Sequence, residues 1–151
     1  MIGHSNHSWS AFAKLLTDHK VTALIDVRNY PKSFLGHFCA DQLASALPAL
    51  GISYHHRPAL GGRHPLPETK LREHIAQLPL DAGVCLMCSE GDYTACHRHY
   101  LLAPLLLELG VLIHQIRRDG SLTQDTGPTP ATLAKTRRFR PAAETQMNLF
   151  E

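Results

Sequence analysis

The sequence VCLMCSEGDYTACHR, residues 84–98, is the strongest indication of fold class in this chain. Its apolar start, Val84 to Met87, predicts a buried strand, and a polar loop containing Gly91 follows. Thr94 can cap a helix that continues through a leucine-rich run as far as Leu109. In a parallel α/β sheet, ligands bind beyond the carboxyl end of such a strand. The segment therefore predicts both the fold class and the place of the site.

The rest of the chain alternates strands and helices around this segment. Further strands are expected near residues 1–3, 21–27, 52–56 and 111–116, and helices after Ser8 and over residues 40–50 and 68–78. Pro104 predicts a kink, or an early end, in the helix that follows Thr94. This alternation predicts a Rossmann-like three-layer α/β sandwich, with a mainly parallel sheet of about five strands and helices on both faces.

Length and composition predict one α/β domain, residues 1–120, followed by a polar, basic C-terminal tail, residues 121–151. The 151 residues are 44% hydrophobic and 19% charged, as in ordinary globular domains. Up to Ile116 there are nine Lys/Arg and nine Asp/Glu, and after it six and four, so the excess positive charge lies in the tail. Bulk charge therefore does not indicate nucleic-acid binding by the body of the domain.

We expect a cytoplasmic protein with no membrane partner, because no apolar run is long enough to span a bilayer and the first residues lack a signal pattern. In that compartment the four cysteines would be reduced. Cys85 and Cys88 are three positions apart on a strand, so their side chains point to opposite faces and are not expected to form a disulfide.

Polar residues follow each of the expected parallel strands. Because the carboxyl ends of parallel strands meet at one edge of the sheet, we expect these residues to converge there. The anion- or substrate-binding candidates are His4, Ser5, Arg28, Tyr54, Gly61, Gly62, Cys96 and Arg98, and the catalytic candidates are Glu90, Asp26, His97 and Cys88.

Two different chemistries are open to this group of residues. Glu90 could act as general acid or base, helped by Asp26 or His97, while Arg98 and the start of the helix hold an anion. Alternatively Cys88 could be a nucleophile, as its thiolate. Cys88 and Arg98 are ten positions apart, too far for the short loop of cysteine phosphatases, so we favour Glu90.

The sequence implies no cofactor and no metal, although zinc is a weaker alternative. His4, Cys88, Cys96 and His97 are acceptable zinc ligands. However, seven residues separate Cys88 from Cys96, where a zinc knuckle has two to four, and adjacent Cys96 and His97 would point apart on a helix.

The ordered set of these motifs resembles the family called domain of unknown function 488 (DUF 488). The resemblance covers most of residues 1–120 and is carried by Gly3-His4-Ser5, Asp26-Val27-Arg28 with Pro31 and Ser33, Tyr54 before Leu60-Gly61-Gly62, Cys88-x-Glu90 and Cys96-His97-Arg98. It implies a compact Rossmann-like α/β domain with these motifs gathered at one edge. It implies no particular reaction.

The tail carries a separate motif. Residues 146–150, QMNLF, resemble the bacterial sliding-clamp-binding pentapeptide, in which Gln146, Leu149 and Phe150 would be the binding residues. The alternative is that Leu149 and Phe150 pack back onto the domain. Three nearby arginines could contact phosphates or form a solvated helix end: Arg137, Arg138 and Arg140.

Together these patterns predict a DNA-metabolism or repair-associated enzyme that hydrolyses, or transfers a group of, a nucleotide or nucleic acid and is tethered to the sliding clamp. One alternative is a cysteine-dependent sulfur or acyl transferase acting on a small molecule. Another is a non-catalytic adaptor that binds a nucleotide or nucleic acid.

Overall fold

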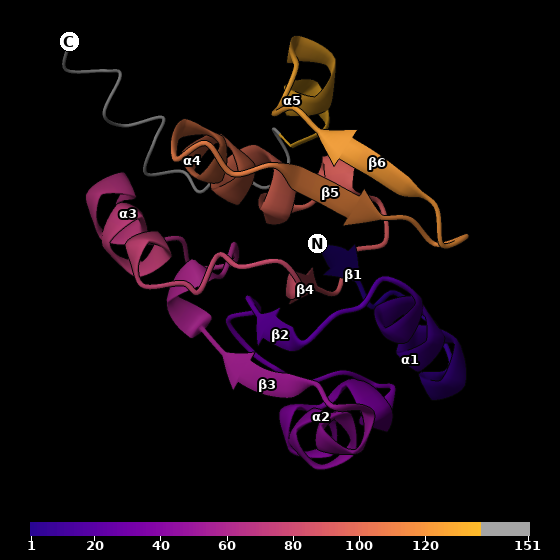
Figure 1. Cartoon of the computed structure of the whole chain (residues 1–151). Helices are drawn as coiled ribbons and strands as arrows, with labels where there is room; N and C mark the ends of the chain where they lie inside the picture. Colours follow the sequence, from indigo (N-terminus) through magenta and orange to yellow (C-terminus); the bar gives the residue numbers. More distant parts are fainter. Residues whose placement is uncertain (137–151) are drawn as a thin grey trace, which may run out of the picture.

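A computed structural model describes residues 1–136, which form one mixed sheet between helices (Figure 1). The strands lie in the order β3-β2-β4-β1-β5-β6, and only β6 is antiparallel to its neighbour. Their bounds are β1 Ile2–Gly3, β2 Ala23–Asp26, β3 Ser53–His56, β4 Val84–Cys88, β5 Ile113–Ile116 and β6 Leu122–Asp125. The predicted α/β fold class is confirmed, with six strands in place of about five.

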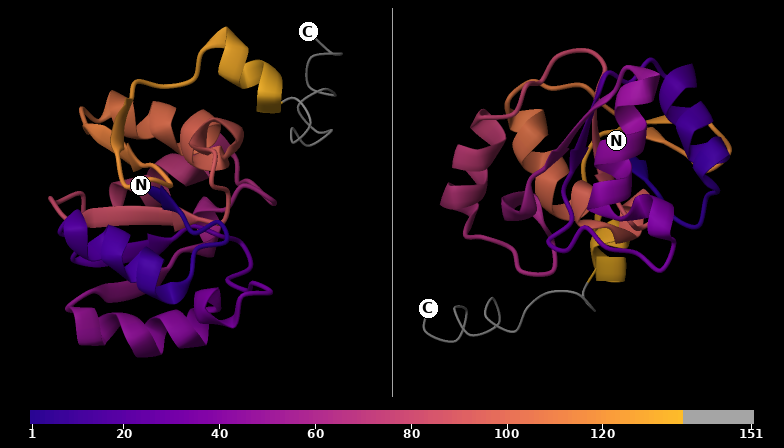
Figure 2. Two further views of the ribbon diagram at one scale, coloured as in Figure 1. Left: turned by 90° about the vertical axis from the view of Figure 1, so that its right-hand side faces the viewer. Right: turned by 90° about the horizontal axis from the view of Figure 1, so that it is seen from below.

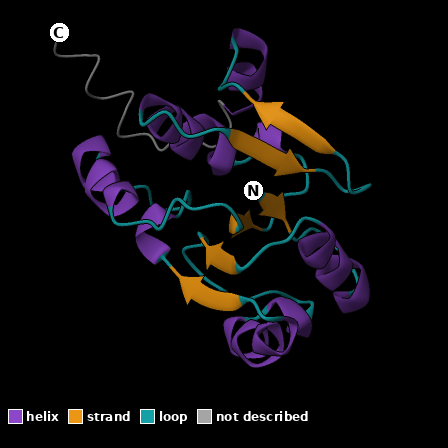
Figure 3. Cartoon of the chain, viewed as in Figure 1, coloured by secondary structure: helices purple, strands orange, loops and turns teal. Residues whose placement is uncertain are grey.

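Helices cover both faces of the sheet (Figures 2 and 3). The α-helices are α1 Trp9–Asp18, α2 Ala40–Ala46, α3 Glu68–Ala76, α4 Ala103–Glu108 and α5 Pro130–Thr136. Short 3₁₀ turns lie at Gly36–Phe38, Leu47–Leu50, Pro58–Leu60 and Tyr93–Ala95, and a π-helical turn at Arg98–Leu102. Among these described residues, no helix is both long and apolar enough to cross a membrane.

Alternation along the strands divides the buried side chains between two apolar cores. Leu24 and Met87 pack with α1 and α2 on one face, whereas Ile25 and Leu86 pack with α3 and α4 on the other. Cys85 belongs to the first core and Cys88 to the second, so their sulfurs lie on opposite faces of the sheet, and both cysteines are free. This confirms the expectation that they form no disulfide.

The single helix expected from Thr94 to Leu109 is wrong. Asp92 caps a 3₁₀ turn at Tyr93–Ala95, and Cys96 then adopts an extended conformation, with φ −110° and ψ 148°. The chain re-enters helix through the π-helical turn, and α4 begins only at Ala103, with Pro104 in its first turn. Proline lacks an amide proton and fits only the start of an α-helix, which explains why α4 is short.

The sheet continues past residue 120, where we had placed the start of the tail. Leu122–Asp125 pairs with β5 as β6, so these residues of the predicted tail belong to the sheet. A short helix, α5, follows β6 and begins at Pro130. The clamp-binding residues Gln146, Leu149 and Phe150, and the arginines before them, lie outside the described residues.

A buried histidine holds β6 and α5 against the rest of the domain. His99 Nδ1 lies 2.9 and 3.0 Å from the Asp125 carboxylate oxygens, and its Nε2 lies 3.1 Å from Thr132 Oγ1. Gln115 Nε2 also donates to Asp125, at 3.0 Å. Because His99 and Asp125 are both buried, this network fixes the last strand beside the π-helical turn.

Candidate functional site

The loops after β1, β2 and β4 meet at the carboxyl edge of the sheet, as predicted. Backbone pairing continues past the strands, since His4 N donates to Cys88 O at 2.8 Å and Ser5 N to Ser89 O at 2.9 Å. Val27 N likewise donates to the Met87 carbonyl, at 3.0 Å. These bonds hold the polar loops in fixed register with one another.

Asp26 and Arg28 form a buried ion pair beneath this edge. The Asp26 carboxylate accepts from Arg28 Nε at 2.8 Å, from Arg28 NH2 at 2.6 Å and from the Tyr54 hydroxyl at 2.6 Å. Arg28 NH2 also donates to the Phe38 carbonyl, at 2.8 Å. Burial, and then the bond to Asp26, raise the pKa of Tyr54, which therefore stays a neutral donor. The polar groups that we expected to bind substrate or assist catalysis are here bonded to one another.

His4 is a buried neutral imidazole beside this ion pair. Its Nδ1 donates to the Ser5 carbonyl at 2.8 Å, and its Nε2 accepts from Arg28 NH1 at 3.3 Å. The ring stacks on Phe38 with centroids 4.3 Å apart. Burial lowers the pKa of His4. His4 thus supports Arg28 from behind, and Ser5 turns away to accept from Arg118 NH1 at 3.1 Å.

Gly3, near the start of the chain, packs closely against the Glu90 carbonyl and the buried Arg98 side chain. Arg98 NH2 donates to the Glu90 carbonyl at 2.9 Å, and a Cβ at Gly3 would overlap that carbonyl oxygen. Arg98 is 1% exposed, yet its Nε and NH1 have no hydrogen-bond partner among the described residues. A buried guanidinium with one bonded nitrogen needs an anionic group nearby.

Cys88, Cys96 and His97, which we name the thiol cluster, lie together beside that guanidinium. His97 Nδ1 is 3.6 Å from the Cys88 sulfur and 3.6 Å from the Cys96 sulfur. His97 Nε2 donates to the Val27 carbonyl at 3.1 Å, so Nδ1 carries the lone pair that faces the two thiols. A hydrogen bond from Cys96 lowers the pKa of Cys88, whereas the bond to Cys88 and burial raise the pKa of Cys96.

A glycine lets His97 reach this position. An ideal Cβ at Gly62 would lie 2.5 Å from His97 Cβ and Cγ, closer than any ordinary contact. Gly61 is equally close to the Asn29 side chain, whose Oδ1 accepts from the amides of Arg63, at 2.8 Å, and His64, at 3.1 Å. The predicted Gly61-Gly62 pair therefore packs the loop after β3 against the site.

A cavity of about 440 Å³, which we name the edge pocket, opens above the thiol cluster. Its lining comprises Arg28, Asn29, Tyr30, Lys32, Gly62, Arg63, Cys88, Ser89, Glu90, Ala95, Cys96, His97 and Tyr100. Lys32 and Arg63 are exposed at its rim, and Glu90 is its one carboxylate. Glu90 Oε1 accepts from the Asp92 amide at 3.0 Å. The pocket thus joins a cationic rim to a sulfur- and imidazole-containing floor.

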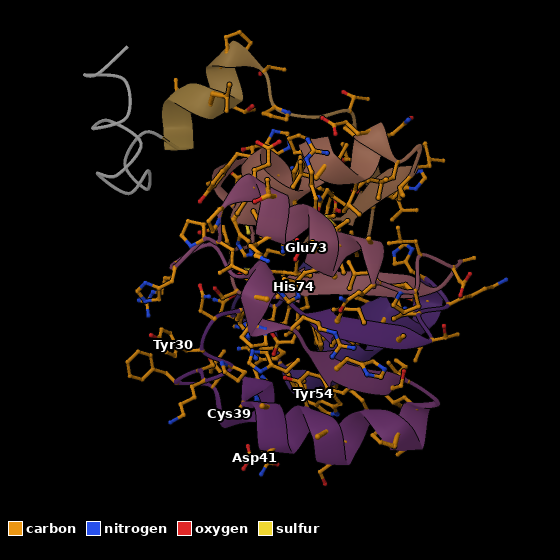
Figure 4. The ribbon with its side chains drawn as sticks, turned by 90° about the vertical axis from the view of Figure 1, so that its left-hand side faces the viewer. Tyr30, Cys39, Asp41, Tyr54, Glu73 and His74 are labelled. Atoms are coloured by element: carbon orange, nitrogen blue, oxygen red, sulfur yellow. The ribbon has the colours of Figure 1, made fainter. Side chains whose placement is uncertain are left out.

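The structure brings most of the predicted residues to this edge but only some into the pocket. Arg28, Gly62, Glu90 and the thiol cluster line the pocket, whereas His4, Ser5, Asp26, Tyr54, Gly61 and Arg98 do not. Four lining residues that the sequence analysis missed, Asn29, Tyr30, Lys32 and Arg63, lie on the loops after β2 and β3, and Figure 4 shows Tyr30 projecting outward at the edge of the molecule. The sequence does carry an indication of these residues, because residues 27–39 and 57–66 contain four Lys/Arg and no carboxylate.

The reasoning that separated Cys96 from His97 is wrong. It placed both residues on one helix, where adjacent side chains diverge, but Cys96 is extended and its sulfur turns toward Cys88. All three ligand-type atoms of the thiol cluster lie within 4.8 Å of one another, which could accommodate a metal ion. His4, the fourth candidate ligand, is engaged with Ser5 and Arg28.

A larger cavity, of about 710 Å³, opens at the opposite edge of the sheet. It lies between the starts of β4 and β5, where the two-residue β1 does not reach, and Val84 and Ile113 line it. Its walls are mainly apolar side chains, and no cluster of potential metal ligands lies there among the described residues. The edge pocket is therefore the better candidate for chemistry, despite its smaller volume.

Comparison with known proteins gives one match. No curated protein and no solved structure matches the chain. The model of the family described as Domain of unknown function DUF488 matches residues 8–77, a segment that contains the Asp26–Arg28 pair and Gly61-Gly62 but not the thiol cluster. The chain is therefore similar to the DUF488 family over residues 8–77, which supports the resemblance seen in the sequence.

Proposed function

We propose that this protein is an enzyme that binds an anionic substrate in the edge pocket and hydrolyses it, or transfers a group from it. The substrate class that we propose is a nucleotide or the end of a nucleic-acid strand. The observation that carries the proposal is the composition of the pocket, in which Lys32 and Arg63 at the rim face a floor of ionisable groups. A pocket of about 440 Å³ lies within the usual range for small-molecule sites.

Charge at the rim favours an anion. Lys32 and Arg63 come from the two loops that contain no carboxylate, and Asn29 fixes the backbone at Arg63. Arg28 adds a buried positive charge from the pocket wall, although Asp26 neutralises most of it. Tyr30 and Tyr100, the two aromatic residues of the lining, give a base or another flat ring apolar surfaces to contact.

Glu90 is the proposed general acid or base. It is exposed at the pocket mouth, and its Oε1 accepts a hydrogen bond from the Asp92 amide. The carboxylate therefore remains accessible to a substrate. It would take a proton from an attacking water as the new bond forms, and the proton would pass to the leaving group as the glycosidic or phosphodiester bond breaks. Asp26, by contrast, is fully buried and bonded to Arg28 and Tyr54, so it supports the site from below.

A turnover screen tests this proposal. The full chain is incubated with nucleotides, nucleosides and short single- and double-stranded oligonucleotides, and the products are identified by mass spectrometry. Glu90→Gln should lower turnover by about 10²–10⁴-fold, the usual contribution of a general acid or base. Glu73→Gln, an exposed glutamate on α3 labelled in Figure 4, is the matched control and should keep full activity. Binding without any turnover would instead favour the non-catalytic adaptor.

A second candidate is a cysteine-dependent group transferase, favoured by the position of Cys88. Its sulfur lines the pocket, and His97 Nδ1 at 3.6 Å can take its proton. The sulfur would bond to the transferred group as the leaving group departs, and the proton would move from His97 to the leaving group. Cys88→Ala would then abolish turnover while Glu90→Gln retained it, the reverse of the result expected for the first candidate.

We also propose that the tail tethers the protein to a replication sliding clamp. The support is the motif alone, with Gln146, Leu149 and Phe150 at its fixed positions. Capture on the immobilised clamp should be lost when Leu149 and Phe150 are both changed to alanine. The matched control changes Met147 and Asn148, at the variable positions, and should be captured as the unaltered chain is. Equal recovery of both variants would contradict the tether.

A further inference from the structure

We infer that Cys88, Cys96 and His97 form a binding site for a thiophilic divalent cation of the zinc class, with its open coordination position in the edge pocket. The inference deepens the proposed function, because it places the cation at the floor of the same pocket. Cation binding does not itself require that the pocket be catalytic.

The distances within the thiol cluster match a tetrahedral site. With Zn–S of about 2.3 Å and Zn–N of about 2.0–2.1 Å, a tetrahedral ion holds its sulfur and nitrogen ligands about 3.6 Å apart. His97 Nδ1 lies 3.6 Å from each of the two sulfurs, and all three atoms lie within 4.8 Å of one another. One ion bound between them could therefore contact all three atoms.

The second hydrogen bond of His97 is the one that metal-bound histidines make. Its Nε2 donates to the Val27 carbonyl at 3.1 Å, which fixes the ring and leaves the Nδ1 lone pair directed at the sulfurs. Metal-ligating histidines almost always donate their other ring nitrogen to a carbonyl or carboxylate in this way. Gly62 and the loop that carries it pack on the same ring, so His97 is preoriented.

A cation can bind both sulfurs directly, which the Nδ1 atom of His97 cannot do. The Nδ1 atom has one lone pair, so it can accept a proton from only one of the two sulfurs that lie 3.6 Å away. A soft divalent ion takes both sulfurs as thiolates. Burial of all three groups among the packed loops keeps competing water away from the ligand bonds.

The fourth position would face the edge pocket, because all three residues line it. Catalytic zinc sites keep three protein ligands and one open position, whereas structural sites use four protein ligands. Arg98, beside the thiol cluster, is 1% exposed, and two of its guanidinium nitrogens have no partner among residues 1–136. A dication with two thiolates is neutral, so an anion at the fourth position would balance Arg98.

Cobalt(II) titration of the full chain tests the site. The protein is stripped with chelator under reducing conditions and titrated with Co²⁺, and Zn²⁺ is then added. We expect one Co²⁺ per chain, with the intense visible bands of tetrahedral cobalt and sulfur-to-cobalt charge transfer, both removed by Zn²⁺. Cys96→Ser should weaken binding at least 100-fold, and Cys39→Ser, at a free cysteine outside the cluster, should leave it unchanged.

Alkylation mapped by mass spectrometry gives a readout that does not depend on any variant folding. Bound Zn²⁺ should protect Cys88 and Cys96 from iodoacetamide and leave Cys39 as reactive as before. Weak octahedral cobalt spectra, or equal alkylation of Cys88 with and without Zn²⁺, would overturn the site. Either result would overturn the cation site alone, whereas stoichiometric cation binding without turnover of any nucleotide would overturn the proposed enzyme alone.

Discussion

Replacement of Gly62 by alanine should disrupt the thiol cluster while leaving the sheet intact. The new methyl group would lie 2.5 Å from His97 Cβ and Cγ, where carbon atoms normally approach to about 3.5–4.0 Å. His97 or the Gly62 loop must therefore move by about 1 Å. Such overpacking costs about 1–3 kcal/mol, and the lower entropy of the unfolded alanine chain offsets about 0.4–1 kcal/mol of it.

Chemical denaturation and metal titration measure the two consequences separately. We expect the free energy of unfolding to fall by about 1–2 kcal/mol. A displacement of His97 by about 1 Å would also weaken its hydrogen bond to the Val27 carbonyl. The affinity for Zn²⁺ should therefore fall about 10–100-fold, as it does when a metal-bound histidine loses its outer hydrogen bond. Gly36→Ala is the matched control, since nothing lies within 4 Å of its Cβ. If both variants behave alike, the packing of Gly62 on His97 is not what positions the imidazole.

Three other changes test the surroundings of the site. Asp26→Asn should lower the free energy of unfolding, measured by urea titration, by about 3–5 kcal/mol, because Arg28 would keep a buried charge without its partner. Asp18→Asn, at an exposed ion pair with Lys14, should lower it by only about 0–1 kcal/mol. Equal losses in the two variants would contradict the burial argument. Asp125→Asn should speed amide hydrogen exchange in β6 and α5 more than in β2, because His99 loses its charged partner. An equal increase in the exchange rate of all three elements would show that this network does not anchor the last strand. Burial lowers the pKa of His4, so the unfolded chain binds more protons and stability should fall as the pH drops below about 6.5. The free energy of unfolding should therefore differ less between pH 7.5 and pH 5.5 in His4→Gln than in the unaltered chain. An equal difference in both proteins would assign the effect to other groups.

The fold could be predicted because hydrophobic periodicity and loop chemistry agree along most of the chain. The apolar run at Val84, the Ser8 cap and the Gly51 helix end each act locally, and the structure contains all three. β6 could not be predicted in the same way. Its sequence, LTQD, is polar and exposed on alternate residues, and it is fixed by pairing with β5 and by Asp125 meeting His99 from elsewhere in the chain.

The residues of the site were predictable, but their partners were not. Loops after parallel strands had to converge, and they brought Arg28, Glu90, Cys88 and His97 to one edge. The helix assumed after Thr94 hid the thiol cluster, because one extended residue, Cys96, reverses the direction of its side chain. Cys96 comes just before the π-helical turn at Arg98–Leu102, an irregular start that the spacing of the leucines does not indicate.

The central claim is that the edge pocket binds an anionic substrate through its cationic rim. Isothermal titration calorimetry with a nucleoside 5′-monophosphate, and with the same nucleoside lacking the phosphate, tests it directly. We expect the monophosphate to bind more tightly, with affinity that falls as salt rises, and Arg63→Gln with Lys32→Gln to remove most of that preference. Arg72→Gln, at an exposed ion pair on α3, should leave it unchanged. Equal affinity for both ligands, or a preference that survives loss of both rim cations, would contradict the account.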